Sequence, residues 1–224
     1  MPDFRHVRNW IFDLDNTLYP AACGLFAQID RRMTQFVAET LNVAFEEAKT
    51  IRKAYYREHG TTLNGLMRLH GIDPEIYLSY VHDIDLSALQ CDTHLDAALA
   101  RLEGQRFVFT NGCRHHAIRV LERLKLADRF DDIWDIRTIG FCPKPDPQAY
   151  ETVLTAAGIE PSRAAMFEDA ARNLVPARAL GMTTVWLRND SEWSRKGPDH
   201  PVASREHIDH EIADLAHFLH AIRI

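Results

Sequence analysis

The chain has 224 residues, 46% of them hydrophobic, and a formal net charge of -6. That is enough apolar material for a full core, but no apolar run is as long as a membrane span. No basic block is present of the kind that follows nucleic-acid phosphates, so we expect a protein that binds neither nucleic acid nor membrane.

Four cysteines are scattered along the chain without the paired spacing of a zinc site or a disulfide framework. They are Cys23, Cys91, Cys113 and Cys142. The first six residues lack the basic-then-apolar pattern of a secretory signal. We therefore expect a reduced, cytoplasmic protein.

The first predicted element is a strand over residues 7–13, which ends in two carboxylates, Asp13 and Asp15. An ionised carboxylate is costly to bury without a partner, and Mg²⁺ prefers one or two carboxylates together with phosphate oxygens. The two acids could also share a reaction, one attacking phosphorus and the other moving a proton. Taken alone, the segment is equally consistent with a strand that runs into an Asp/Asn turn.

Residues 20–90 have a helical hydrophobic periodicity, with apolar side chains three or four positions apart. This spacing predicts four helices, beginning near residues 25, 45, 63 and 74. Gly71 closes the third helix, and Pro74 opens the fourth at the first helical position. We expect a helical cap domain over residues 20–91, inserted into a core domain formed by residues 1–19 and 92–224.

After the helical segment, strands alternate with helices. Predicted strands lie near residues 107–110, 133–136, 164–167 and 183–187, and a closing helix carries Ile212, Leu215, Phe218 and Leu219. The alternation predicts an α/β fold, a Rossmann-like parallel sheet with helices on both faces. Ligands of such sheets bind beyond the carboxyl ends of the strands, where the inserted helices would form a lid.

Polar side chains occupy three further positions in this pattern. Thr110 and Asn111 end the second strand, Lys144 stands between two prolines, and Glu168 and Asp169 end a later strand. Each has an ordinary explanation: a turn, a solvated loop lysine, and a favourable charge at a helix N-terminus worth about 0.3–1 kcal/mol. Their joint occurrence favours a metal between the carboxylates, with Lys144 and Thr110 on the phosphoryl oxygens.

These segments resemble the four motifs of the haloacid dehalogenase (HAD) superfamily of phosphohydrolases. The matching residues are Asp13-x-Asp15-x-Thr17, Thr110-Asn111-Gly112, Lys144-Pro145 and Glu168-Asp169. The inserted helices resemble the C1-type helical cap of that superfamily. Residues 13–20, 60–67 and 81–85 are most similar to its pyrimidine 5'-nucleotidase-like members.

The resemblance implies a Mg²⁺-dependent phosphatase that forms an aspartyl-phosphate. Asp13 would be the nucleophile, and Asp15 would protonate the leaving alkoxide and then activate water. Mg²⁺ would be held by Asp13, the backbone carbonyl of Asp15, and Asp169. Glu168 would be either a ligand through water or a supporting group behind the ligands.

Phosphate binding falls, by the same resemblance, to Thr110, Asn111 and Lys144. Asn173, four residues after Asp169, would orient the acidic pair. Arg114, His115 and His116, just after Asn111-Gly112, would contact phosphate or the cap, and His116 could equally stabilise the start of its helix.

The substrate implied is a small phosphate monoester, in particular a pyrimidine nucleoside 5'-monophosphate. Another small metabolite, such as a phosphoglycolate or a sugar phosphate, is the alternative. A binding protein that keeps the fold without turnover is a third reading, and the retained Asp13, Asp15, Lys144 and Asp169 argue against it. Side chains near the cap mouth that could contact a base, or simply pack within the cap, are Phe26, Tyr56, His59, Thr61 and Asn64.

Overall fold

The computed structural model describes residues 1–189 and 205–224. The chain divides into two compact units. One consists of Met1–Cys23 together with Leu89–Ile224, and the other of Gly24–Ala88.

The first unit is built on a parallel sheet of six strands in the order β3-β2-β1-β4-β5-β6. The strands are β1 (Asn9–Phe12), β2 (Gln105–Phe109), β3 (Asp132–Trp134), β4 (Ala164–Glu168), β5 (Thr183–Leu187) and β6 (His210–Ile212). From β1 the chain adds β2 and β3 on one side of the sheet, and it then adds β4, β5 and β6 on the other side of β1. The direction in which strands are added therefore reverses between β1 and β4. Ligand crevices form at such reversals, beyond the carboxyl ends of the strands.

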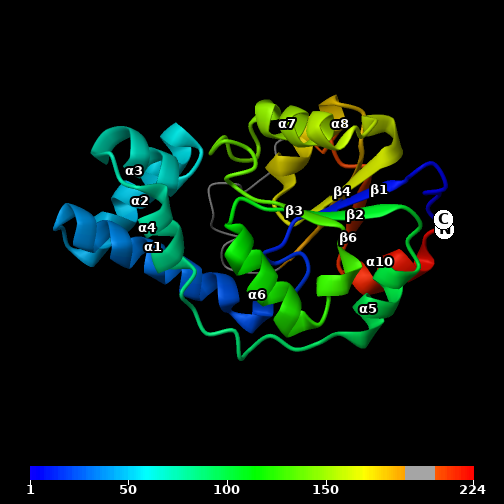
Figure 1. Cartoon of the computed structure of the whole chain (residues 1–224), viewed down its shortest axis with the longest axis horizontal. Coiled ribbons are helices and arrows are strands. Elements are labelled where there is room, and N and C mark those ends of the chain that lie inside the picture. Colours follow the sequence, from blue (N-terminus) through cyan, green and yellow to red (C-terminus); the bar gives the residue numbers. More distant parts are fainter. Residues whose placement is uncertain (190–204) are drawn as a thin grey trace. The chain divides into compact units, whose positions relative to one another are not determined.

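Helices cover both faces of this sheet (Figure 1). One face carries α7 (Pro147–Ala157) and α8 (Leu174–Ala179). The other carries α5 (Thr93–Ala100), α6 (Arg114–Leu124) and α10 (Leu215–Ala221). The prediction of a Rossmann-like α/β fold is confirmed.

Short 3-10 turns connect several of these elements. They are η1 (Ala21–Cys23), η2 (Ala127–Arg129), η3 (Pro161–Arg163) and η4 (Ala171–Asn173).

The core of this unit lies around the two central strands. Every residue of β4 is buried, as expected for a parallel strand that is covered on both faces. Phe12 of β1 stacks on Phe167 of β4 with ring centroids 4.6 Å apart. This stacking packs together the ends of β1 and β4, where Asp13 and Glu168 lie.

The second unit, Gly24–Ala88, contains four helices. They are α1 (Leu25–Leu41), α2 (Phe45–His59), α3 (Thr62–His70) and α4 (Pro74–Val81). Gly71 ends α3 in the left-handed conformation, at φ 62°, and Asp73 caps α4 immediately before Pro74. These boundaries follow the start and stop signals in the sequence.

Two elements were not predicted, and one prediction is wrong. The sequence pattern did not indicate helix α5 or strand β6, and Ile212 lies in β6 rather than on the closing helix. Strand β6 has three residues, none fully buried, so its apolar pattern is weak. In the described part of the chain, no helix is both long and apolar enough to span a membrane.

Candidate active site

The carboxyl ends of β1, β2 and β4 bring three of the predicted residues to one edge of the sheet. Asp13 follows the last residue of β1, and its backbone N–H donates to the Phe167 carbonyl at 2.9 Å. Thr110 follows β2, and Glu168 is the last residue of β4. The neighbouring parallel strands β1 and β4 therefore place Asp13 and Glu168 side by side, although the two residues are 155 positions apart in the chain.

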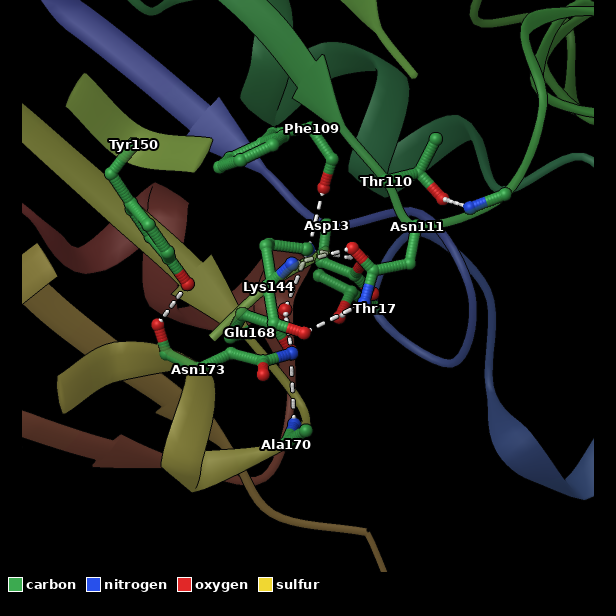
Figure 2. A network of polar contacts seen from close by, with 11 residues as sticks. Asp13, Thr17, Phe109, Thr110, Asn111, Lys144, Tyr150, Glu168, Ala170 and Asn173 are labelled. Atoms are coloured by element: carbon green, nitrogen blue, oxygen red, sulfur yellow. Dashed lines mark hydrogen bonds and ion pairs between the residues drawn. The ribbon is translucent and has the colours of Figure 1, made fainter. Parts of the chain in front are cut away.

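Lys144 lies at the centre of this edge (Figure 2). Its Nζ donates to Asp13 Oδ1 at 2.8 Å, to Glu168 Oε1 at 2.7 Å and to the Phe109 carbonyl at 2.6 Å. The side chain is only 1% exposed. An ammonium has three protons and no acceptor, so these three contacts satisfy it completely.

The buried charges shift one another's protonation equilibria. Burial and the charge of Glu168 raise the pKa of Asp13 to about 7, although Lys144 acts in the opposite direction. Burial alone would lower the pKa of Lys144, but the carboxylates of Asp13 and Glu168 outweigh it and raise the pKa. The lysine therefore stays charged, and negative charge at this edge exceeds what one ammonium neutralises.

Asn111 contacts the backbone of Lys144 rather than its ammonium. The Asn111 Nδ2 donates to the Lys144 carbonyl at 3.0 Å, and Asn111 Oδ1 accepts from the Lys144 N–H at 2.8 Å. Thr110 Oγ1 accepts from the Gly112 N–H at 2.9 Å. The side chain of Asn111 thus fixes the loop that carries Lys144, and the hydroxyl of Thr110 shapes the turn after β2.

Glu168 is held from several sides. Its Oε1 accepts from Asn173 Nδ2 at 2.7 Å, in addition to Lys144, and its Oε2 accepts from the Ala170 N–H at 3.0 Å. The Tyr150 hydroxyl in turn donates to the Asn173 carbonyl (Figure 2). Asn173 therefore contacts one member of the acidic pair, Glu168.

Asp169 completes a group of three carboxylates. One ligand oxygen each from Asp13, Glu168 and Asp169 lies within 4.8 Å of the others. Asp169 Oδ2 accepts from Asn189 Nδ2 at 3.0 Å. Burial and the charges of Glu168 and Asp13 raise the pKa of Asp169 well above its usual range.

This donor set suits a hard divalent cation. All three donors are carboxylate oxygens, the ligand type that Mg²⁺ prefers. Burial, and after it the neighbouring carboxylates, raise the pKa values of Asp13 and Asp169, so ionising both acids here is unfavourable without a further cation. A bound cation would offset that cost.

Asp15 faces two partners that the sequence did not identify. Its Oδ1 accepts from the Tyr19 hydroxyl and lies 3.0 Å from His116 Nε2. Tyr19 lies two residues after the Asp13-x-Asp15-x-Thr17 motif, and the sequence predicts for His116 only a contact with phosphate or the cap, or a role at the start of its helix. Thr17 Oγ1 likewise donates to Asp13 Oδ2, at 3.3 Å.

In the helical unit, two of the expected base-contacting residues serve its own helices. Thr61 Oγ1 accepts from the Asn64 N–H at 3.0 Å and so caps α3. Asn64 Nδ2 donates to the His59 carbonyl at 3.3 Å. For Thr61 and Asn64 the packing alternative therefore has direct support.

Comparison with known proteins points to one family. Residues 7–181 match the haloacid dehalogenase-like hydrolases. A HAD-hydrolase from Bacillus subtilis, solved with bound magnesium, has the same fold at a TM-score of 0.59 and 19% identity, covering 97% of this chain and 99% of that one.

Two curated relatives have names that bear on phosphate. Phosphate metabolism protein 8 of Saccharomyces cerevisiae is 30% identical over 193 residues, which are 79% of this chain and 60% of the yeast protein. Glyceraldehyde 3-phosphate phosphatase of Methanocaldococcus jannaschii is 25% identical over 232 aligned positions and covers 97% of both chains. The chain thus spans about three fifths of the yeast relative and nearly all of the archaeal one.

Proposed function

This chain belongs to the haloacid dehalogenase-like hydrolase family, and we propose that it is a Mg²⁺-dependent phosphatase of small phosphate monoesters. One observation carries the proposal: the Lys144 ammonium bridges Asp13 and Glu168 at the carboxyl edge of the sheet, with Asp169 completing the carboxylate group. A dianionic phosphate needs such a cation beside its nucleophile, because otherwise the two negative charges repel.

In the proposed reaction, an oxygen of Asp13 bonds to phosphorus while the bond from phosphorus to the ester oxygen breaks. Asp15 gives its proton to the departing alkoxide. Water then attacks the aspartyl-phosphate and gives a proton to Asp15, and phosphate is released from Asp13. Atoms balance: one ester and one water yield one alcohol and one phosphate.

Mg²⁺ would be held by Asp13, Asp169 and the backbone carbonyl of Asp15, and would offset charge between the carboxylates and the phosphoryl oxygens. Glu168 is engaged by Lys144, Asn173 and the Ala170 N–H. This supports a role for Glu168 behind the ligands, where it holds the lysine.

The phosphoryl group would be bound by Lys144, by Thr110 and by the backbone beside Asn111. The side chain of Asn111 supports this indirectly, because it fixes the backbone of Lys144. Loss of one such charge-stabilising contact typically costs about 3–4 kcal/mol in the transition state.

A Mg²⁺ titration of phosphate release from p-nitrophenyl phosphate tests the activity. We expect release that rises with Mg²⁺ and stops when EDTA is added. Equal release with and without EDTA would contradict the metal requirement, and no release at any Mg²⁺ concentration would contradict the phosphatase itself.

For the substrate, we propose pyrimidine nucleoside 5'-monophosphates, on the resemblance of residues 13–20, 60–67 and 81–85 to that subgroup. A phosphorylated sugar or triose is the second candidate, because the archaeal relative over 97% of the chain is a glyceraldehyde 3-phosphate phosphatase. A panel of UMP, CMP, glyceraldehyde 3-phosphate and phosphoglycolate distinguishes them. Equal turnover of UMP and phosphoglycolate would remove the nucleotide preference.

A further inference from the structure

His116 is a buried histidine whose ring contacts the proposed acid. Its side chain is 0% exposed, and its Nε2 lies 3.0 Å from Asp15 Oδ1. The two residues are 101 positions apart in the chain. Buried polar side chains usually have a specific partner, and here that partner is a carboxylate beside the proposed nucleophile.

The start of helix α6 does not need this ring. The backbone N–H of His116 donates to Cys113 Sγ at 3.4 Å, and the N–H of Arg114 donates to Asp135 Oδ2 at 2.9 Å. The first turn of α6 is therefore capped by other residues. This anchoring fixes the position from which the His116 imidazole reaches Asp15.

Tyr19 contacts the same oxygen of Asp15 as His116 does. Its hydroxyl donates to Asp15 Oδ1, the oxygen that also faces His116. These two contacts to Oδ1 fix the orientation of the Asp15 carboxylate.

We propose that His116 is a positioning residue that holds Asp15 with Oδ2 directed to the ester oxygen. This inference rests on the proposed phosphatase function and deepens it. In the step concerned, the Oδ2 proton of Asp15 passes to the ester oxygen as the phosphorus–oxygen bond breaks. His116 neither gains nor loses a proton in that step. Misplacement of a catalytic group by about 1 Å costs on the order of 10²-fold in rate.

The leaving group provides the readout. An alkoxide needs a proton to leave, whereas p-nitrophenolate leaves as a stable anion, so only alkyl phosphates depend on a well-placed acid. We would measure kcat/KM, which reports the step that phosphorylates Asp13, for p-nitrophenyl phosphate and for the alkyl phosphate that the wild-type protein hydrolyses fastest.

Two polar variants form a matched pair. The amide of His116→Gln reaches the position of Nε2, whereas the shorter amide of His116→Asn does not. We expect His116→Asn to lose about 10²-fold in kcat/KM on the alkyl phosphate and less than about threefold on p-nitrophenyl phosphate. We expect His116→Gln to stay within about fivefold of wild type on both esters.

Val120→Ala is the control for destabilisation alone. Val120 is buried on the same helix, one turn further along, and has no contact with Asp15 among the described hydrogen bonds. It should lower the melting temperature and leave the ratio of the two kcat/KM values unchanged.

Equal losses of His116→Asn on both esters, or no loss on either, would overturn the positioning role while leaving the phosphatase intact. Failure of the wild-type protein to hydrolyse any phosphate ester would instead overturn the proposed function, and the role of His116 with it.

Discussion

At the scale of single residues, the buried charge balance depends on Lys144. It contacts both Asp13 and Glu168, and both carboxylates are almost completely shielded from solvent. Removing one member of a buried ion pair leaves an uncompensated charge, which typically costs about 3–5 kcal/mol. Loss of Lys144 should therefore lower the stability of the fold as well as change the charge of the candidate site.

Asp13→Asn should abolish turnover while the protein stays folded. The amide has nearly the same size, and Lys144 keeps its contacts with Glu168 and the Phe109 carbonyl. An amide cannot attack phosphorus, so we expect kcat to fall by at least about 10³-fold. Phosphate release and circular dichroism would be measured together. Substantial residual turnover by a folded variant would exclude the covalent mechanism.

Asp169→Ala should raise the Mg²⁺ concentration needed for half-maximal activity. The variant removes one carboxylate of the three-carboxylate group, and loss of a group that supports a metal site typically costs about 10–100-fold in affinity. Asp128→Ala, which removes an exposed acid of η2, is the control for net charge. An unchanged Mg²⁺ titration for Asp169→Ala would refute the ligand role.

The sequence was sufficient to anticipate that Asp13, Lys144 and Glu168 meet. Two of them end parallel strands, and the carboxyl ends of parallel strands share one edge. The partners of Asp15 could not be anticipated in the same way. The approach of His116 depends on how α6 begins and where the turn after β1 directs Asp15, and neither has a residue pattern of its own.

At the scale of elements, helices with a clear apolar stripe or a start signal were predictable, and helix α5 was not. Helix α1 has 17 residues with a clear apolar stripe, and α4 has both an Asp cap and a proline at its start. Helix α5 has eight residues and buries only Leu95, Ala98 and Leu99. Three buried positions define a helical period only weakly, and although Asp92 caps α5, no proline opens it as Pro74 opens α4.

Gly104→Ala should destabilise the sheet more than a glycine substitution elsewhere. Gly104 precedes β2 at φ 94°, and a Cβ there would lie 2.1 Å from the Arg8 carbonyl oxygen. That carbonyl also accepts from the Gln105 N–H, at 2.9 Å, so it cannot move away freely. We expect a loss of more than about 3 kcal/mol in the free energy of unfolding.

Gly181→Ala is the matched control. Gly181 has the same φ of 94°, and nothing lies within 4 Å of the added carbon. Only the backbone strain remains, so a loss of about 1–2 kcal/mol is expected. Urea unfolding of both variants would separate steric conflict from strain. Equal losses would mean that the contact with Arg8 is relieved at no cost.

At the scale of the whole molecule, the site concentrates negative charge in a protein that is already acidic. The net charge is -6, and three carboxylates lie together at the reversal point of the sheet. We therefore expect a bound cation to stabilise this fold.

Mg²⁺ should stabilise the protein more at pH 8 than at pH 5. The pKa of Asp13 is about 7 in the metal-free fold against an ordinary value of 3.8. The folded state therefore binds more protons than the unfolded state between these values, and stability falls as pH rises through that window. Mg²⁺ binds the ionised carboxylates and counteracts the loss.

Melting temperatures in Mg²⁺ and in EDTA, at both pH values, would measure this effect. Asp13→Asn should lose part of the pH dependence, because it cannot ionise. The same Mg²⁺ shift at pH 5 and pH 8 would contradict the linkage.

The paired hydrogen bonds between the Asn111 amide and the Lys144 backbone have a consequence for engineering. They connect the loop between β3 and α7 to the turn that follows β2, so the position of Lys144 depends on both segments. A designer who transplants residues 135–146 into a related scaffold would have to carry Asn111 along. Otherwise the transplanted lysine would lose the two backbone hydrogen bonds that hold it in position.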